Sequence, residues 1–137
     1  MKKLKEREFH QTMRGYFAGH LYNAMCDNED IWVLTGDLGY GMWDKIRADF
    51  PDKFINTGAA EQSLVDLGVG LALEGKIPFC YSISTFLLRR AYEQIYLYAH
   101  HEKIPVKLVA SGYKYDYKHD GISHWPLEQE ILLYNIF

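Results

Sequence analysis

The stretch Asn56-Thr57-Gly58-Ala59-Ala60-Glu61-Gln62 stands between a short strand, predicted at residues 53–56, and a helix predicted at residues 63–74. Apolar side chains recur on nearly every side of that helix, which is typical of a helix buried in a protein core. Gly68 and Gly70 interrupt it, and each should cost about 1 kcal/mol against alanine. A helix tolerates such glycines where another backbone comes close, so we expect close packing around it.

Glu61 falls in the first turn of this buried helix, just after a strand end and beside small residues. A carboxylate gains there from the positive end of the helix dipole, while burial disfavours its charged form. Position alone favours an ordinary glutamate at a helix start. A functional role for Glu61 therefore needs support from the rest of the chain.

The composition of the 137 residues narrows the classes of function. Hydrophobic residues make up 48% and charged residues 24%, as in globular domains that bury a core. The net charge of −3 argues against nucleic acid and anionic membranes as partners. Cys26 and Cys80 lie far apart in apolar runs, and neither a secretory signal nor an apolar stretch of membrane-spanning length is visible. We therefore expect reduced, buried thiols in a soluble, cytoplasmic protein.

Short apolar strands alternate with helices along the chain. Strands are predicted at residues 31–35, 53–56, 77–82 and 105–110, and helices at residues 6–27, 43–50, 63–74, 86–100 and 127–136. This alternation predicts the α/β class, with one doubly wound, mostly parallel sheet and helices on both faces. We expect residues 1–137 to form one domain. A closing strand would be expected after the last helix, and its absence suggests a fragment of a longer subunit or a domain completed by another chain.

Polar residues cluster after each predicted strand. In an open parallel sheet these positions share the carboxyl edge, where ligands bind. The clusters are Gly36-Asp37, Glu61, Ser82 to Arg90, and Asp120 to His124. Their coincidence at one edge favours a functional role for Glu61.

Other interpretations of these clusters are weaker. Residues 36–39 are glycine-rich but match neither the dinucleotide nor the P-loop motif, so an ordinary turn is favoured. Arg89 and Arg90 could meet an anionic ligand or form a solvated helix face. His119, Asp120 and His124 carry metal-binding groups, but their spacing matches no zinc pattern and we assign no metal. An acid–base or hydrogen-bonding role is preferred for the last of them.

Five ordered motifs together resemble the pyrimidine-binding domain of transketolase-type thiamine diphosphate enzymes, a thiamine diphosphate-binding fold. They lie at residues 30–39, 54–62, 71–79, 84–95 and 120–124. The last, Asp120-Gly121-Ile122-Ser123-His124, resembles the D-G-P-[ST]-H element of that family. The resemblance covers nearly the whole chain, and the split-chain transketolases and deoxyxylulose-phosphate synthases are the branches it resembles most.

The resemblance implies that Glu61 hydrogen-bonds a ring nitrogen of the cofactor's aminopyrimidine and so helps to activate the cofactor. It implies that Phe86 stacks on the pyrimidine and that Asp37 lies near the thiazolium ring. Arg89 takes the position of a third pocket residue, as in the synthase branch. Ile83 stands where relatives usually have a first aromatic residue, so stacking would be one-sided.

The resemblance also implies a substrate side to the site. Asp120 and His124 would contact the hydroxyls or the carbonyl of a sugar, with His124 as a second catalytic residue. The chain departs from the family here, because Gly112 aligns with a substrate histidine of many transketolases and residues 115–119 replace a glycine-rich loop. These departures leave the identity of the substrate open.

The family binds the diphosphate and its Mg²⁺ through a G-D-G…N motif on a separate domain, and this chain has no such motif. The resemblance therefore implies a partner chain that holds diphosphate and Mg²⁺, a homo- or hetero-oligomer, and no activity without that partner. The implied function is transfer of two-carbon ketol units between sugar phosphates. The alternatives are a deoxyxylulose-phosphate-synthase-like or 2-oxoacid-decarboxylating subunit, and a non-catalytic homologue that only binds a partner.

Overall fold

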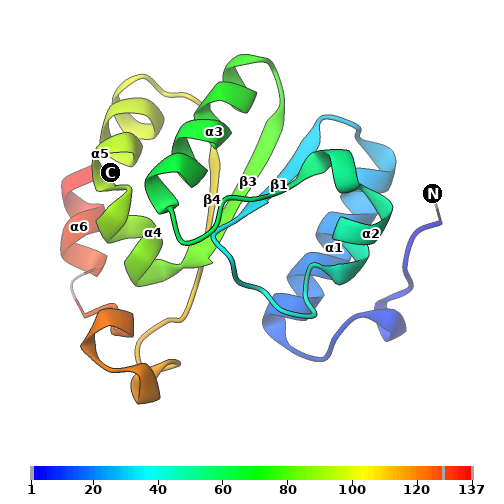
Figure 1. Ribbon diagram of the computed structural model, residues 1–137, viewed down its shortest axis with the longest axis horizontal. Helices are drawn as coiled ribbons and strands as arrows, with labels where there is room; N and C mark the ends of the chain where they lie inside the picture. The colour runs from blue at the N-terminus through cyan, green and yellow to red at the C-terminus, as the bar shows by residue number, and fades with distance from the viewer. Residues whose placement is uncertain (1, 128, 137) are drawn as a thin grey trace.

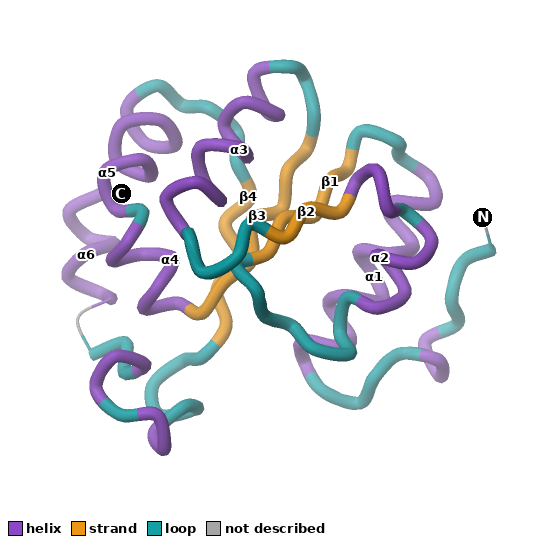
Figure 2. Tube along the Cα trace, viewed as in Figure 1, coloured by secondary structure: helices purple, strands orange, loops and turns teal. Residues whose placement is uncertain are grey.

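The computed structural model, which describes residues 2–127 and 129–136, places a four-stranded sheet at the centre of the molecule (Figure 1). The strands are β1 (Ile31–Thr35), β2 (Phe54–Asn56), β3 (Ile77–Ile83) and β4 (Lys107–Ser111). Figure 2 shows the strands, in orange, together at the centre of the molecule. They are hydrogen-bonded in the order β2-β1-β3-β4, and every neighbouring pair is parallel. Their carboxyl ends therefore lie at one edge, which confirms the predicted fold class.

Helices cover both faces of this sheet (Figure 1). One face carries α1 (Met13–Asp27) and α2 (Asp44–Asp49). The other carries α3 (Glu61–Leu73), α4 (Ser84–Arg90), α5 (Tyr92–Gln94), the π-helix η3 (Ile95–His101) and α6 (Gln129–Ile136). Single 3-10 turns complete the chain at η1 (Glu6–Glu8), η2 (Pro51–Lys53), η4 (Lys118–Asp120) and η5 (Ile122–His124). Among the described residues, no helix is both long and apolar enough to cross a membrane.

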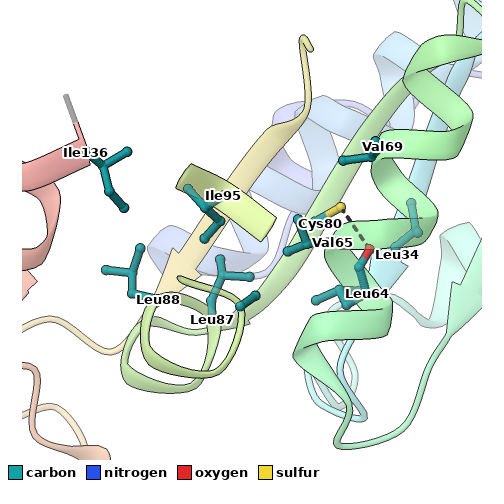
Figure 3. Packing of buried hydrophobic residues seen from close by; sticks show 10 residues of the cluster. Leu34, Leu64, Val65, Val69, Cys80, Leu87, Leu88, Ile95 and Ile136 are labelled. Atoms are coloured by element: carbon teal, nitrogen blue, oxygen red, sulfur yellow. Dashed lines mark hydrogen bonds between the residues drawn. The ribbon is translucent and has the colours of Figure 1, made fainter. Parts of the chain in front are cut away.

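The apolar side chains of the strands belong to two clusters, one on each face of the sheet, because successive side chains of a strand point to opposite faces. Leu34 and Cys80 pack under α3 and α4, whereas Val33 and Tyr81 pack under α1 and α2. Figure 3 shows the first cluster, in which the Cys80 thiol donates to the carbonyl oxygen of Leu64 at 3.5 Å. Burial raises the pKa of this thiol to about 12.

Both cysteines are free thiols, as expected, but they differ in exposure. Cys80 is buried, whereas Cys26 is only half-buried near the end of α1. The two thiols should therefore differ in reactivity, since the thiolate is the reactive form and needs access to solvent.

The helix predicted at residues 6–27 is wrong over its first seven residues, 6–12. Residues 6–8 form a separate turn, and α1 begins at Met13. The Thr12 hydroxyl accepts a hydrogen bond from the Gly15 amide at 3.1 Å, so it caps the helix and sets its start.

The helix predicted at residues 86–100 is also different in the structure. It starts at Ser84, is interrupted at Ala91, and continues as η3 with π-type turns. Ala91 and Ile95 are both completely buried and lie four residues apart, so both face the same core although the helix is irregular between them. The fourth strand starts at Lys107, after Pro105, which has no amide proton for the sheet. The last helix is described from Gln129, and residue 128 lies outside the described residues.

The two glycines of α3 have different surroundings. A Cβ at Gly68 would come within 2.5 Å of Cys80 Sγ and 3.2 Å of Val106 Cγ1, so this glycine permits the close approach of helix and sheet. A Cβ at Gly70 would meet no atom within 4 Å. Close packing therefore explains Gly68, and within the described chain it does not explain Gly70.

Replacing each glycine with alanine should separate these two roles. Both variants gain the helix propensity of alanine, so Gly70→Ala should stabilise the fold by up to about 1 kcal/mol. Gly68→Ala should be less stable than Gly70→Ala by about 1–3 kcal/mol, because its methyl group overpacks the core. Urea unfolding of both variants would measure the difference. Equal stabilities would contradict the close approach. Adding Cys80→Ala removes the atom that the new methyl group would strike, so it should recover stability in Gly68→Ala and give no such gain in Gly70→Ala.

The thiols should differ in their reaction with a thiol reagent at pH 8. Because burial raises the pKa of Cys80 to about 12, its thiolate is scarce at that pH, and Cys26 should react first. Mass spectrometry of the native protein after timed alkylation would show which residue is modified. Urea-unfolded protein is the control, in which both thiols should react at similar rates. Equal rates in the native state would contradict the burial of Cys80.

Candidate functional site at the carboxyl edge of the sheet

Glu61 is the first residue of α3 and is almost completely buried, with 1% of its surface exposed. It lies at the helix N-terminus, where unpaired amides favour a negative charge. A buried carboxylate still needs hydrogen-bond or charge partners, because desolvation of an unpaired charge costs several kcal/mol. The structure provides such partners from two other elements.

Ser82 and Arg90 hold the two carboxylate oxygens of Glu61. The Ser82 hydroxyl, on β3 and fully buried, donates to Oε1 at 2.8 Å. Arg90 Nη1, at the end of α4, donates to Oε2 at 2.7 Å. The arginine side chain remains 44% exposed, so the ion pair reaches from the interior to the surface. The carboxylate is thus fixed from inside by a hydroxyl and met from outside by a cation.

An aromatic ring lies next to this ion pair. The Arg90 guanidinium lies over the Phe86 ring, with its Cζ 4.0 Å from the ring centroid. His124 packs against the same ring edge-to-face, with centroids 4.7 Å apart. The 3-10 turn η5 is thereby brought to α4, although the two are far apart in sequence.

Gly36 packs closely against the carboxylate. A Cβ at this position would lie 3.2 Å from Glu61 Oε1 and 3.3 Å from Ser82 Oγ. Such contacts are tighter than ordinary van der Waals distances, so a side chain here would push the carboxylate or the hydroxyl away. The end of β1 therefore approaches Glu61 with backbone alone.

Asp37 is joined to the end of β2 by a compact hydrogen-bond system. Its φ of 59° lies in the left-handed region that aspartate tolerates better than most residues. Asn56 Oδ1 accepts from the amides of Asp37 and Gly58, both at 3.0 Å, and Asn56 Nδ2 donates to Asp37 Oδ1 at 3.0 Å. Asp37 and Asn56 also line a hollow of about 130 Å³ beside β1 and β2.

Residues 112–125 form the outer part of the site. Ser84 donates to the carbonyl oxygen of Gly112 at 2.6 Å, and a Cβ at Gly112 would strike the Tyr117 ring. Tyr117 accepts a hydrogen bond from Arg14 Nη1 at 2.7 Å, which connects this segment to α1. Asp120 is exposed on the same segment. In Figure 1 this segment, in orange, lies below α4.

The sequence-predicted residues occupy the expected edge, and the structure groups them unequally. Glu61, Phe86 and His124 belong to one cluster through Arg90 and the Phe86 ring. Ile83 is half-buried at the end of β3, and Asp37 is held by Asn56. Arg89 donates to the carbonyl oxygen of Trp125 at 3.5 Å. The arginine that contacts both Glu61 and Phe86 is therefore its neighbour Arg90.

Sequence reasoning gave no individual role to Ser82 or Asn56. Ser82 is a polar residue in an otherwise apolar strand, and Asn56 ends a strand directly before a glycine turn. Both signals were visible, but only the parallel register shows which carboxylates these side chains reach. Among the described residues, no group of three or more His, Cys, Asp or Glu side chains is arranged to hold a metal ion.

A doubly wound sheet with ligand positions at its carboxyl edge defines a class of α/β ligand-binding domain. Residues 10–136 match the family described as the transketolase pyrimidine binding domain. The chain therefore belongs to the transketolase family, as a pyrimidine-binding domain. Membership of this family implies dependence on thiamine diphosphate.

Two curated relatives illustrate the match. A protein named as a transketolase C-terminal section from Methanocaldococcus jannaschii is 38% identical over 120 residues, which are 87% of this chain and 38% of that protein. A 1-deoxy-D-xylulose-5-phosphate synthase from Clostridium perfringens is 46% identical over 110 residues, which are 79% of this chain and 17% of that protein. The chain thus spans well under half of the length of either relative.

Two solved structures agree with this assignment. A split-gene transketolase, described as an inactive beta4 tetramer, is 32% identical with a TM-score of 0.70, and the match covers 85% of this chain and 37% of that one. A transketolase from Leishmania mexicana has a TM-score of 0.79 at 20% identity and covers 96% of this chain and 22% of that one. The second likeness shows the fold alone.

The residues around Glu61 fit the aminopyrimidine of thiamine diphosphate. Phe86 already carries a flat, nitrogen-bearing group at stacking distance, the guanidinium of Arg90. Glu61 presents a buried carboxylate beside that group, and Gly36 removes the side chain that would crowd it. A flat heterocycle with ring and exocyclic nitrogens matches this combination of a stacking face and an acceptor.

Removing the Asn56 side chain should loosen the edge around Asp37. Asn56→Ala loses three hydrogen bonds, and because the side chain is exposed we expect a loss of only about 1–2 kcal/mol in unfolding free energy. Amide hydrogen exchange at Asp37 and Gly58 should accelerate. Asp52→Ala, a surface change nearby, is the matched control and should leave both amides unchanged. Unchanged exchange in Asn56→Ala would contradict the hydrogen-bond system.

Proposed function

We propose that this chain is the pyrimidine-binding half of a thiamine diphosphate-dependent transketolase-like enzyme that transfers two-carbon ketol units between sugar phosphates. The observation that carries the proposal is Glu61, a buried carboxylate at a helix start, with Ser82 behind it and Phe86 beside it. When bound, thiamine diphosphate supplies the carbanion chemistry of ketol transfer. The protein supplies the orientation and the proton handling.

In this proposal Glu61 holds the aminopyrimidine through its ring nitrogen. Ser82 fixes Oε1, and Oε2, which accepts from Arg90 in this structure, is the oxygen that we assign to the cofactor. Phe86 stacks on the ring, and Ile83 contributes an aliphatic wall at the end of β3. Burial keeps water away from the carboxylate, so a hydrogen bond made there is stronger than one made in solvent. Asp37 and Arg89 complete the cofactor positions.

We place the sugar on the side of the site formed by residues 112–125. His124 touches Phe86 and so lies beside the proposed pyrimidine position. Ser123 Oγ lies 2.9 Å from His124 Nδ1, which can orient the imidazole. An imidazole near neutrality can exchange a proton with a sugar hydroxyl or carbonyl. Asp120, exposed on the same segment, is proposed as a hydrogen-bond acceptor for the sugar.

The other half of the cofactor site is assigned to a partner. The described residues include no acidic cluster for Mg²⁺, and the sequence has no diphosphate motif. We propose that a chain with the diphosphate-binding domain supplies both and assembles with this chain into an oligomer. The split-gene relative of known structure, an inactive tetramer of one kind of chain, supports this division.

A second candidate function is the synthase reaction, in which a 2-oxoacid is decarboxylated. The 46% identity to a deoxyxylulose-phosphate synthase favours it, because that is higher than the 38% identity to the transketolase section. The two activities use the same half-site. They differ in the donor, and release of CO₂ from a 2-oxoacid would identify the synthase reaction.

The test combines this chain with a diphosphate-domain partner and compares the wild type with Glu61→Ala. Uptake of thiamine diphosphate with Mg²⁺ is measured by isothermal titration, and transfer from a ketose phosphate to an aldose phosphate is measured in the same assembly. Because Glu61 handles a proton in the reaction, we expect the rate to fall about 10²- to 10⁴-fold in the variant.

Glu74→Ala is the matched control, since it removes an exposed glutamate at the other end of α3. It should retain both uptake and activity. Assembly with the partner but no cofactor uptake by the wild type would favour the non-catalytic, partner-binding homologue. Activity indifferent to Glu61→Ala would contradict the proposed site.

A further inference from the structure

We propose that Arg90 is an internal plug of the pyrimidine site: its guanidinium occupies the place of the aminopyrimidine and has to leave before the cofactor can bind. This inference rests on the proposed function, because it takes Glu61 and Phe86 as the pyrimidine contacts. It adds a conformational step on this chain.

The guanidinium makes the two contacts that we propose for the aminopyrimidine, one with Phe86 and one with Glu61. Its Cζ lies 4.0 Å from the centroid of Phe86, which is a stacking distance, and its Nη1 lies 2.7 Å from Glu61 Oε2. A guanidinium is planar and presents N–H donors at its rim. An aminopyrimidine stacked on the same face of Phe86 and held by the same carboxylate oxygen would need the same volume. Two flat groups cannot stack at that distance in one place, so binding of one excludes the other.

The plug also explains how Glu61 can stay buried when no cofactor is present. A carboxylate with 1% exposure and only one hydroxyl partner would be poorly compensated. The Arg90 cation provides the missing charge. Cofactor binding exchanges this partner for a ring nitrogen. Because a carboxylate and an unprotonated ring nitrogen are both acceptors, Glu61 takes up a proton from solvent when the cation leaves and donates it to the nitrogen, so no unpaired charge is left buried.

The position of Arg90 in the chain permits it to move. It is the last residue of α4, and the next residue, Ala91, leaves the helical conformation at φ −105° and ψ 24°. Its side chain is 44% exposed, so it can turn into solvent without opening the core. The buried partner, Ser82, holds Glu61 in place during this exchange because it comes from a strand at the centre of the sheet.

The experiment measures binding of thiamine diphosphate with Mg²⁺ to the full chain assembled with its diphosphate-domain partner. A plug that is closed nine-tenths of the time weakens the apparent affinity about tenfold, so Arg90→Ala should bind about tenfold more tightly than the wild type. Arg90→Lys keeps a positive charge near Glu61 but lacks the planar group, and it should also bind more tightly than the wild type. Lys107→Ala is the matched control: it removes an exposed positive charge at the start of β4, away from the carboxyl edge, and should bind less than twofold differently from the wild type.

A second readout follows the plug itself and does not depend on affinity. In ¹⁵N spectra of the wild-type assembly without cofactor, the Arg90 guanidinium protons should exchange slowly with water. Addition of thiamine diphosphate with Mg²⁺ should make their exchange fast, as in a solvent-exposed arginine. Arg90→Ala identifies the signal by its loss. Slow exchange that persists at saturating cofactor would overturn the plug.

The outcomes separate this inference from the function on which it rests. Normal cofactor uptake by the wild type, with equal or weaker binding by Arg90→Ala and Arg90→Lys, would overturn the plug and leave the proposed function standing. No uptake by the wild type or by either variant in the assembled state would overturn the proposed function and the plug together. Should Arg90→Ala fail to fold, Arg90→Lys and the exchange measurement decide the matter.

Discussion

The hydrogen-bonded carboxylate of Glu61 is the interaction on which the arrangement of this edge depends. Three elements meet at its two oxygens: α3 carries it, β3 supplies the Ser82 hydroxyl, and α4 supplies the Arg90 guanidinium. Each partner contributes because an unpaired buried charge is expensive, so a group that replaces either partner has to make the same kind of contact with the carboxyl group. The same requirement makes Glu61 suited to hold a nitrogen heterocycle.

The parallel sheet explains why these elements meet. Parallel pairing of β2, β1, β3 and β4 puts all four carboxyl ends at one edge, and the segments that follow the strands collect there. Asn56 locks the turn after β1 to the end of β2, and Gly112 admits the segment that carries His124. The core beneath is closely packed at Gly68, so α3 is held at a fixed height over the sheet. A rigid scaffold thus positions a site that is made mostly of loop and helix-end residues.

The family match shows which kind of domain this chain is, whereas the site geometry shows which of its residues surround Glu61. Membership in the transketolase family is shown by the match over residues 10–136. The Glu61 edge belongs to this chain and can be studied on it, whereas diphosphate and Mg²⁺ binding is assigned to a partner. An internal cation at the pyrimidine position would give the unassembled half-site a stable resting state. Assembly and cofactor uptake would then draw on the same movement of Arg90.

The sequence by itself determined the α/β class, the position of candidate residues after each predicted strand, and the placement of Glu61 at a buried helix start. Periodicity and turn residues are local signals, so they carried this information. They failed at residues 6–12 and at Ala91, where capping by Thr12 and burial in the core decide the helix geometry. Only the tertiary structure decided that Ser82 reaches Glu61 and that Arg90, beside Arg89, is the arginine that contacts Glu61 and Phe86. Those contacts join residues 21 and 29 positions apart, and such distances close only when strands pair and helices pack.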